Sequence, residues 1–97
     1  MMYVINADYG GFEVPEEVIS TLGCGRYGLD YEGDIRTNEV LIAWVREHRD
    51  ETDLALVEIP DEATDWEKEE CDGYESIIAV VDGRIVHLNE WEFEEEE

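Results

Sequence analysis

The charge of this chain is the feature that most restricts its fold. Its 97 residues include 28 Asp and Glu against 6 Lys and Arg, which gives a formal net charge of −22. Folding brings these carboxylates closer together, and their mutual repulsion opposes a compact state. Hydrophobic residues nevertheless make up 43% of the chain, which is enough for a packed core. We therefore expect one folded acidic domain over residues 1–97.

The charge is also unevenly distributed. Residues 1–49 carry a net charge of −5, whereas residues 50–97 carry −17 because nineteen acidic residues face only Lys68 and Arg84. Such a field repels nucleic acid and anionic membranes and attracts basic surfaces. It excludes direct nucleic-acid binding through a basic footprint, and no apolar run approaches the ~20 residues of a membrane span.

The cysteines and the N-terminal residues indicate the cellular compartment. Cys24 and Cys71 lie far apart and outside any C-x-x-C spacing, and the start of the sequence lacks the basic and apolar segments of a signal peptide. We expect a cytoplasmic protein with reduced thiols.

Two helices are predicted from local patterns. Residues 14–23 place Pro15 at a helix start and Gly23 at a helix stop, with Val18, Ile19 and Leu22 as the buried stripe. Residues 38–51 begin with Asn38, a good N-cap. Their apolar face, at helical spacing, comprises Val40, Leu41, Trp44, Val45 and His48.

Strand signals complete the fold class. Residues 3–5 and 54–60 are short apolar or β-branched runs, residues 64–71 read as an exposed strand, and residues 76–89 form two β-branched runs around Asp82-Gly83. Asp-Gly at this position is the type I′ hairpin signal. We expect an α+β fold in which two helices pack on one face of a small, mainly antiparallel sheet.

Several short motifs occur together in a recognisable order. They are "YGGF" (9–12), Arg-Thr-Asn (36–38), "VEIPDE" (57–62), Trp66 and "DGYE" (72–75). In this combination the chain resembles a group of small uncharacterised bacteriophage and prophage proteins over roughly residues 2–78. The resemblance implies a phage-type protein that acts on the machinery of a bacterial host cell, and it brings no catalytic residues with it.

Chemistry-bearing patterns are weak. A catalytic carboxylate pair needs a pocket that separates two pKa values, and the EF-hand-like run from Asp30 lacks the required glycine and the final glutamate. His48 and His87 lie at no zinc-type spacing from each other or from the two cysteines, so His48 is expected to cap its helix and His87 to face out from a strand. We predict a non-enzymatic protein with no catalytic residue, no metal and no cofactor.

The acidic residues of the C-terminal half form the predicted binding surface. Alternate residues of a strand project to one face about 6.6 Å apart, which is comparable to the spacing of phosphates along a nucleic-acid strand. Glu67 and Glu69 fit this pattern, and "NEWEFEEEE" (89–97) predicts an acidic edge strand with Trp91 and Phe93 on its other face. The predicted partner-binding residues are Asp61, Glu62, Asp65, Glu67, Glu69, Glu70, Asp72, Glu75, Glu90, Glu92, Glu94 and Glu96.

These observations favour an inhibitor that mimics nucleic-acid charge. Its partner would be a basic nucleic-acid-binding protein or ribonucleoprotein of the host, and the resemblance implies a defence complex, as for an anti-CRISPR or anti-restriction protein. One alternative is a protein-interaction module that uses exposed aromatic residues, with Tyr9, Phe12, Tyr27, Tyr31 and Trp66 as candidates. Another is a salt-adapted acidic domain without inhibitory role. A homodimer formed by strand addition at the 77–88 hairpin is a further possibility.

Overall fold

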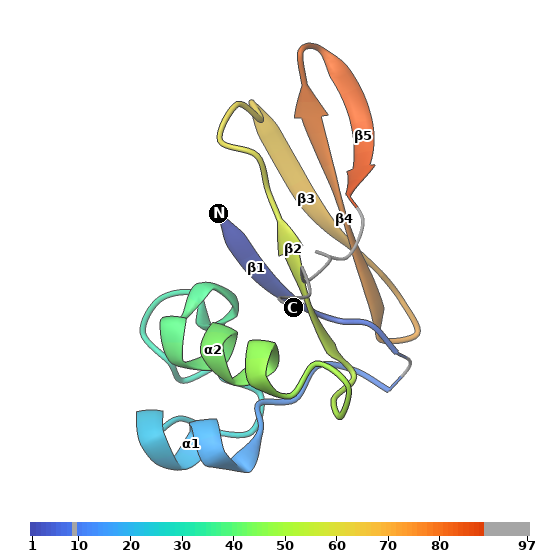
Figure 1. Ribbon diagram of the computed structural model, residues 1–97. Helices are drawn as coiled ribbons and strands as arrows, with labels where there is room; N and C mark the ends of the chain where they lie inside the picture. Colours follow the sequence, from blue (N-terminus) through green and yellow to red (C-terminus); the bar gives the residue numbers. More distant parts are fainter. Residues whose placement is uncertain (9, 89–97) are drawn as a thin grey trace, which may run out of the picture.

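The computed structural model describes residues 1–8 and 10–88 (Figure 1). Within them the chain forms five strands, two α-helices and one 3-10 helix. In chain order these are β1 (Met2–Asn6), α1 (Glu16–Leu22), η1 (Ile35–Thr37), α2 (Glu39–Glu47), β2 (Leu54–Glu58), β3 (Asp65–Cys71), β4 (Tyr74–Val81) and β5 (Arg84–Leu88). None of the described helices is long and apolar enough to cross a bilayer.

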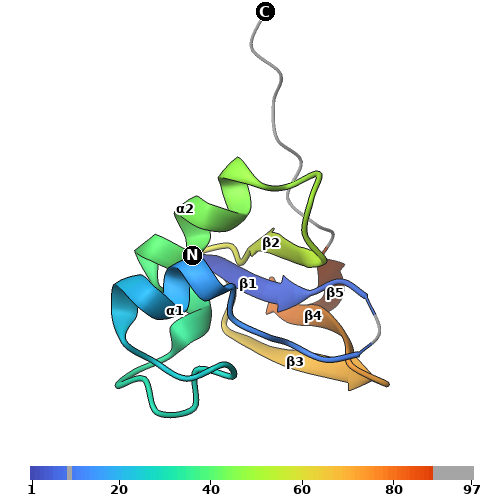
Figure 2. The same ribbon diagram turned by 90° about the horizontal axis from the view of Figure 1, so that it is seen from below.

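The strands divide into two antiparallel sheets. One contains β1 and β2, and the other has the order β3-β4-β5. The helices lie on one side of the β1–β2 sheet and the three-stranded sheet lies on the other (Figures 1 and 2). The α+β class is therefore confirmed, and the two helices do pack on one face of a sheet. The other three strands form a separate layer instead of extending that sheet.

The β1–β2 sheet is buried on both faces because it lies between the other two layers. Val4 and Leu56 point toward the helices and join a cluster with Val18, Leu41 and Val45. The alternate residues of the same strands point toward the three-stranded sheet, where they meet inward-facing residues of β3, β4 and β5. This second cluster comprises Tyr3, Ile5, Ala55, Val57, Ile59 and Ile77, with Trp66 and Leu88 packed against it. Two-sided burial explains why residues 54–57 are apolar without alternation.

The residues predicted to begin and end the helices do so, with Pro15 one position earlier than predicted. Pro15 is the N-cap of α1 and not its first helical residue, and Gly23 ends α1 with a left-handed φ of 71°. The Asn38 side chain accepts hydrogen bonds from the backbone N–H groups of Val40 and Leu41, which confirms it as the N-cap of α2. On the apolar face of α2, Leu41 and Val45 are buried, whereas Val40 is 37% exposed.

Two Asp-Gly turns join the strands of the three-stranded sheet. Asp82 and Gly83 both have positive φ, as a type I′ turn requires, and they connect β4 to β5. Asp72 and Gly73 have the same conformation and connect β3 to β4. The strand β4 consequently begins at Tyr74, before the start of the predicted hairpin.

Candidate interaction surface

The β3–β4 pairing sorts the acidic residues onto opposite faces of the sheet. Trp66 pairs with Ala79, and Lys68 pairs with Ile77. These four side chains face the β1–β2 layer. Ile77 and Ala79 are buried there, and Trp66 packs against the second core cluster. Side chains alternate along a strand, so Asp65, Glu67 and Glu69 project to the outer face. All three are exposed, which confirms the predicted shared face of Glu67 and Glu69.

Within the part of the chain that the structure describes, no cation pairs with Glu67 or Glu69 in the outer row of β3. Lys68 is the one basic residue in the segment 61–75, and it points inward, where its Nζ lies 3.4 Å from Glu75 Oε2. Among the described residues no ion pair forms with Glu67 or Glu69. The outer face of β3 therefore presents a row of exposed carboxylates, of which Glu67 and Glu69 form no ion pair with a described residue.

Glu75 was predicted to bind a partner, and the structure corrects this. Its side chain is only 4% exposed and accepts a bidentate pair of hydrogen bonds from Arg36, at 2.6 Å from Nη1 and 3.0 Å from Nη2. It also accepts a 2.8 Å hydrogen bond from the backbone N–H of Asn6. Glu75 lies on the inner face of β4, where a charge is stable only when it is paired and hydrogen-bonded.

Arg36 and Glu75 together close the free edge of β1. Arg36 Nη1 donates to the backbone carbonyl of Val4 at 3.1 Å, while Glu75 accepts from the next outward-facing N–H, that of Asn6. The guanidinium also lies over the Phe12 ring, 3.7 Å from its centroid. These side chains replace the strand partner that β1 lacks on this side, and such blocking prevents edge-to-edge association.

The pKa of Glu75 reflects two opposing influences. Burial alone would raise its pKa, because a low-dielectric environment disfavours the charged form. The hydrogen bonds from Arg36 and Asn6, with the positive charges of Arg36 and Lys68, outweigh burial and lower the pKa below the ordinary value of 4.5. Glu75 is therefore an ionised structural group and not an acid held ready to donate a proton.

The glycine motifs at 9–12 and 72–75 meet in space. The backbone N–H of Gly10 donates to the carbonyl of Asp72, and the Asn6 side chain donates to the carbonyl of Gly73. A Cβ at Gly73 would lie 2.4 Å from the backbone nitrogen of Gly11, so only glycine fits. The segments 9–12 and 72–75 thus meet at one structural junction.

The other predicted acidic residues do not form a single row. Asp61 and Glu62 are exposed in the β2–β3 connection, Glu70 is exposed at the end of β3, and Asp72 is exposed in the turn. The alternation places Glu70 on the inner face of β3 and not with Glu67 and Glu69. The remaining predicted residues, Glu90, Glu92, Glu94 and Glu96, lie outside the described part of the chain.

An apolar strip beside the carboxylates was missed by the sequence reasoning. Ile78 and Val80 project from β4 to the outer face, and Ile85 of β5 lies next to Val80 and is 69% exposed. The sequence pattern predicted these residues as part of a hairpin but did not indicate which face of it is exposed. The signal that could have revealed them is the unbroken apolar run 77–81 itself, because a strand at the surface of a small domain has one face toward solvent.

The candidate aromatic residues are mostly used in packing. Trp66 makes an edge contact with Tyr3 at 4.9 Å between ring centroids, and Phe12 lies under Arg36. The Tyr31 hydroxyl accepts a hydrogen bond from Asn38. Of these candidates Tyr27 is exposed, at 52%, and Tyr9 lies outside the described residues.

Groups able to bind metals or act as nucleophiles are dispersed. Within residues 1–8 and 10–88, no set of three His, Cys, Asp or Glu side chains is placed to hold a metal ion. Cys24 is buried and Cys71 is exposed. His48 caps α2, with its Nδ1 2.8 Å from the carbonyl of Trp44, and His87 is exposed on β5, as predicted for both.

Comparisons with protein-family models, with curated proteins and with solved structures found no match to this chain. Functional inference therefore depends on the outer face of β3-β4-β5, with its row of exposed carboxylates and its adjacent apolar strip.

Proposed function

We propose that this chain is a non-enzymatic inhibitor that imitates the charge of a nucleic acid. It would occupy the basic groove in which another protein binds DNA or RNA. The observation that supports this is the row of exposed carboxylates on the outer face of β3, formed by Asp65, Glu67 and Glu69. Their spacing of about 6.6 Å per alternate residue allows successive carboxylates to replace successive phosphates.

The inward orientation of Lys68 supports the same function. If Lys68 lay on the outer face, it would neutralise its neighbours in the row; instead it pairs with Glu75 on the inner face. The negative potential at the sheet edge is thereby preserved for a partner. Carboxylates in such an array attract Lys and Arg, speed association through electrostatic steering and bind less tightly as salt rises.

The partner class proposed is a basic nucleic-acid-binding protein or ribonucleoprotein of a bacterial host. The phage-type resemblance makes a defence nuclease, or the complex that targets one, the first class to test. Inhibition would be competitive: the bound acidic domain excludes nucleic acid from the groove, and no bond in either molecule is broken.

The test combines recovery of a partner with a matched pair of charge reversals. A partner is recovered from bacterial host lysate at low salt, and its binding to fluorescein-labelled DNA and RNA is followed by anisotropy while this chain is added. We expect the wild type to displace the nucleic acid and the triple variant D65K/E67K/E69K to lose at least about tenfold in potency. The control E32K/D50K/E51K changes three exposed carboxylates outside the sheet by the same net charge.

Two results would contradict the proposal. Equal losses in the two triple variants would show that net charge alone is responsible and that the β3 row has no special role. Simultaneous binding of nucleic acid and this chain by the recovered partner would exclude competition. Thermal melting of each variant shows that it remains folded.

A further inference from the structure

The outer face of the three-stranded sheet has no covering layer among the described elements. The helices and the β1–β2 sheet all lie on its other side (Figure 2). Ile78 and Val80 are half-buried there by their neighbours in the sheet, and Ile85 is 69% exposed. Apolar side chains grouped on an otherwise charged surface mark a site of interaction.

Strand register places Ile78 and Val80 beside carboxylates of β3, and Ile85 lies on the far side of Val80. Across the sheet, Asp65 pairs with Val80 and Val80 with Ile85. The neighbouring row pairs Glu67 with Ile78 and Ile78 with His87. The outer face is therefore acidic at β3 and aliphatic at Ile78, Val80 and Ile85, with His87 beside Ile78.

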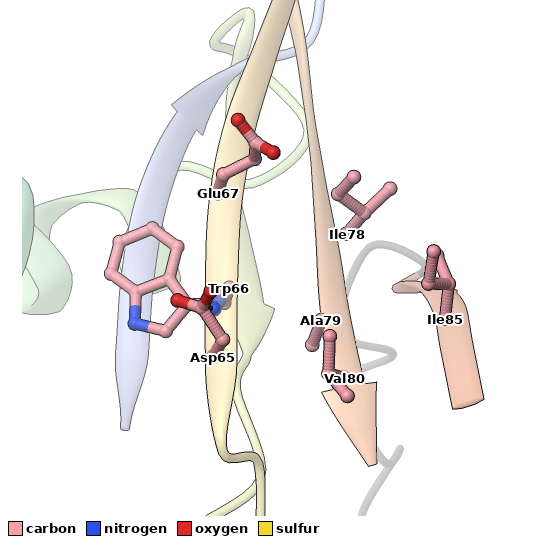
Figure 3. Close-up of a pocket in the computed structure, with 7 residues that line it drawn as sticks. All are labelled: Asp65, Trp66, Glu67, Ile78, Ala79, Val80 and Ile85. Atoms are coloured by element: carbon pink, nitrogen blue, oxygen red, sulfur yellow. Dashed lines mark hydrogen bonds between the residues drawn. The ribbon is translucent and has the colours of Figure 1, made fainter. Parts of the chain in front are cut away.

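A shallow pocket lies along the boundary between the two regions (Figure 3). The Trp66 ring lies on the side of β3 that faces β1, whereas Ile78 and Ile85 lie on the side away from it. The pocket is lined by Asp65, Trp66, Glu67, Ile78, Ala79, Val80 and Ile85.

We infer that this outer face binds a basic protein segment that seats an aliphatic side chain in the pocket and directs Lys or Arg toward Asp65 and Glu67. The inference rests on the proposed function and names the chemistry of its partner. Imitation of phosphates requires only the carboxylates, whereas an apolar anchor beside them adds affinity that salt does not screen. A second copy of this chain is the wrong occupant, because its own carboxylates would oppose those of β3 in a molecule of net charge −22.

The probe is a pair of helical peptides of equal charge. One contains Lys and Leu, with the leucines spaced by three and four residues so that they form a single stripe; in the other, every Leu is replaced by Ala, which preserves helix formation. Both are titrated into the ¹⁵N-labelled full chain at about physiological ionic strength. We expect the Leu peptide to bind at least about tenfold more tightly, with the largest amide shifts at Ile78, Val80 and Ile85.

A matched pair of variants tests whether the aliphatic strip causes this preference. The double variant V80T/I85T retains β-branched side chains and removes apolar surface, and we expect it to abolish the advantage of the Leu peptide. The control L29T alters a residue that is 89% exposed in the connection between α1 and η1, and it should retain the advantage. Circular dichroism shows whether both variants keep the native fold.

Three outcomes would overturn the inference. They are equal binding of the two peptides, an advantage that survives V80T/I85T, and amide shifts centred on Val40 and Ala43 in the groove between α1 and α2. Failure of the proposed function is seen separately, in the nucleic-acid competition. A partner that binds this chain and nucleic acid together would refute mimicry, while the Leu preference and its loss in V80T/I85T would still support the docking surface.

Discussion

Replacement of Glu75 by Gln is expected to destabilise the fold by about 3 kcal/mol, which lies within the range for breaking a buried ion pair. The substitution keeps the shape of the side chain and removes its charge. It leaves the Arg36 guanidinium, whose side chain is 13% exposed, without its bidentate acceptor. One Gln oxygen can still accept from the backbone N–H of Asn6, but the Gln amide group becomes a second donor facing Arg36. For a domain of this length, 3 kcal/mol corresponds to a decrease in Tm of about 15 °C.

The assay is urea denaturation at pH 7, followed by tryptophan fluorescence, with E67Q as the control. Glu67 is exposed on the outer face, so the same chemical change there should alter the free energy of unfolding by less than about 0.5 kcal/mol. A loss below about 1 kcal/mol in E75Q would refute the reasoning, because the network would then contribute no more than a surface ion pair. The double variant R36M/E75L removes both buried charges but leaves the Val4 carbonyl and the Asn6 N–H without these hydrogen-bond partners, so it should recover only part of the loss.

The pH dependence provides a second check on Glu75. Because its folded-state pKa lies below the ordinary value of 4.5, the carboxylate contributes its full stability above about pH 4.5 and loses it as the pH falls through the folded-state pKa. Acid also changes the overall repulsion in a chain whose net charge is −22 at pH 7. The quantity to measure is therefore the stability difference between wild type and E75Q, which should be constant near neutral pH and shrink below pH 4.5.

Three further predictions follow from the described contacts. The variant G73A should lose about 3 kcal/mol or more of unfolding free energy, since a Cβ would overlap a neighbouring backbone. The variant G83A has positive φ but open space around it, so it should lose only about 1–2 kcal/mol. Urea denaturation midpoints compare the two variants, and equal losses would contradict the close approach at Gly73. The variant N38A should lose about 1–2 kcal/mol through loss of the N-cap, measured by thermal melting, and an unchanged Tm would show that the cap is not needed. A thiol reagent should modify Cys71 rapidly in the native protein and Cys24 only in urea, as peptide mass mapping would reveal; rapid modification of both would contradict the buried position of Cys24.

Features that depend on residues adjacent in sequence could be predicted from the sequence. Asn38 followed by an apolar face at helical spacing predicted α2, and Asp82-Gly83 predicted the β4–β5 turn. The Asp72-Gly73 turn carries the same signal and could have been read in the same way. Residues 64–71 were predicted as an exposed strand but were not predicted to form a hairpin with the strand that follows.

The division of the strands into two sheets was not readable from local patterns. β1 pairs with β2 across about fifty residues of chain, and the local sequence of neither strand indicates which strand it pairs with. The same holds for the contact of Gly73 with Gly10 and Gly11. Each motif predicts a turn by itself, and only the folded chain brings the turns together.

The sequence by itself determined the acidic character of the C-terminal half, the α+β class and the alternation that places Glu67 and Glu69 on one face. Only the tertiary structure decided which carboxylate is buried. Glu75 and the outer-row residues are chemically alike, and a strand pattern gives the same alternation whichever face turns inward. Glu75 is buried because Arg36, thirty-nine residues away, compensates the desolvation of its charge. Such compensation depends on distances between remote residues, which the linear sequence does not contain.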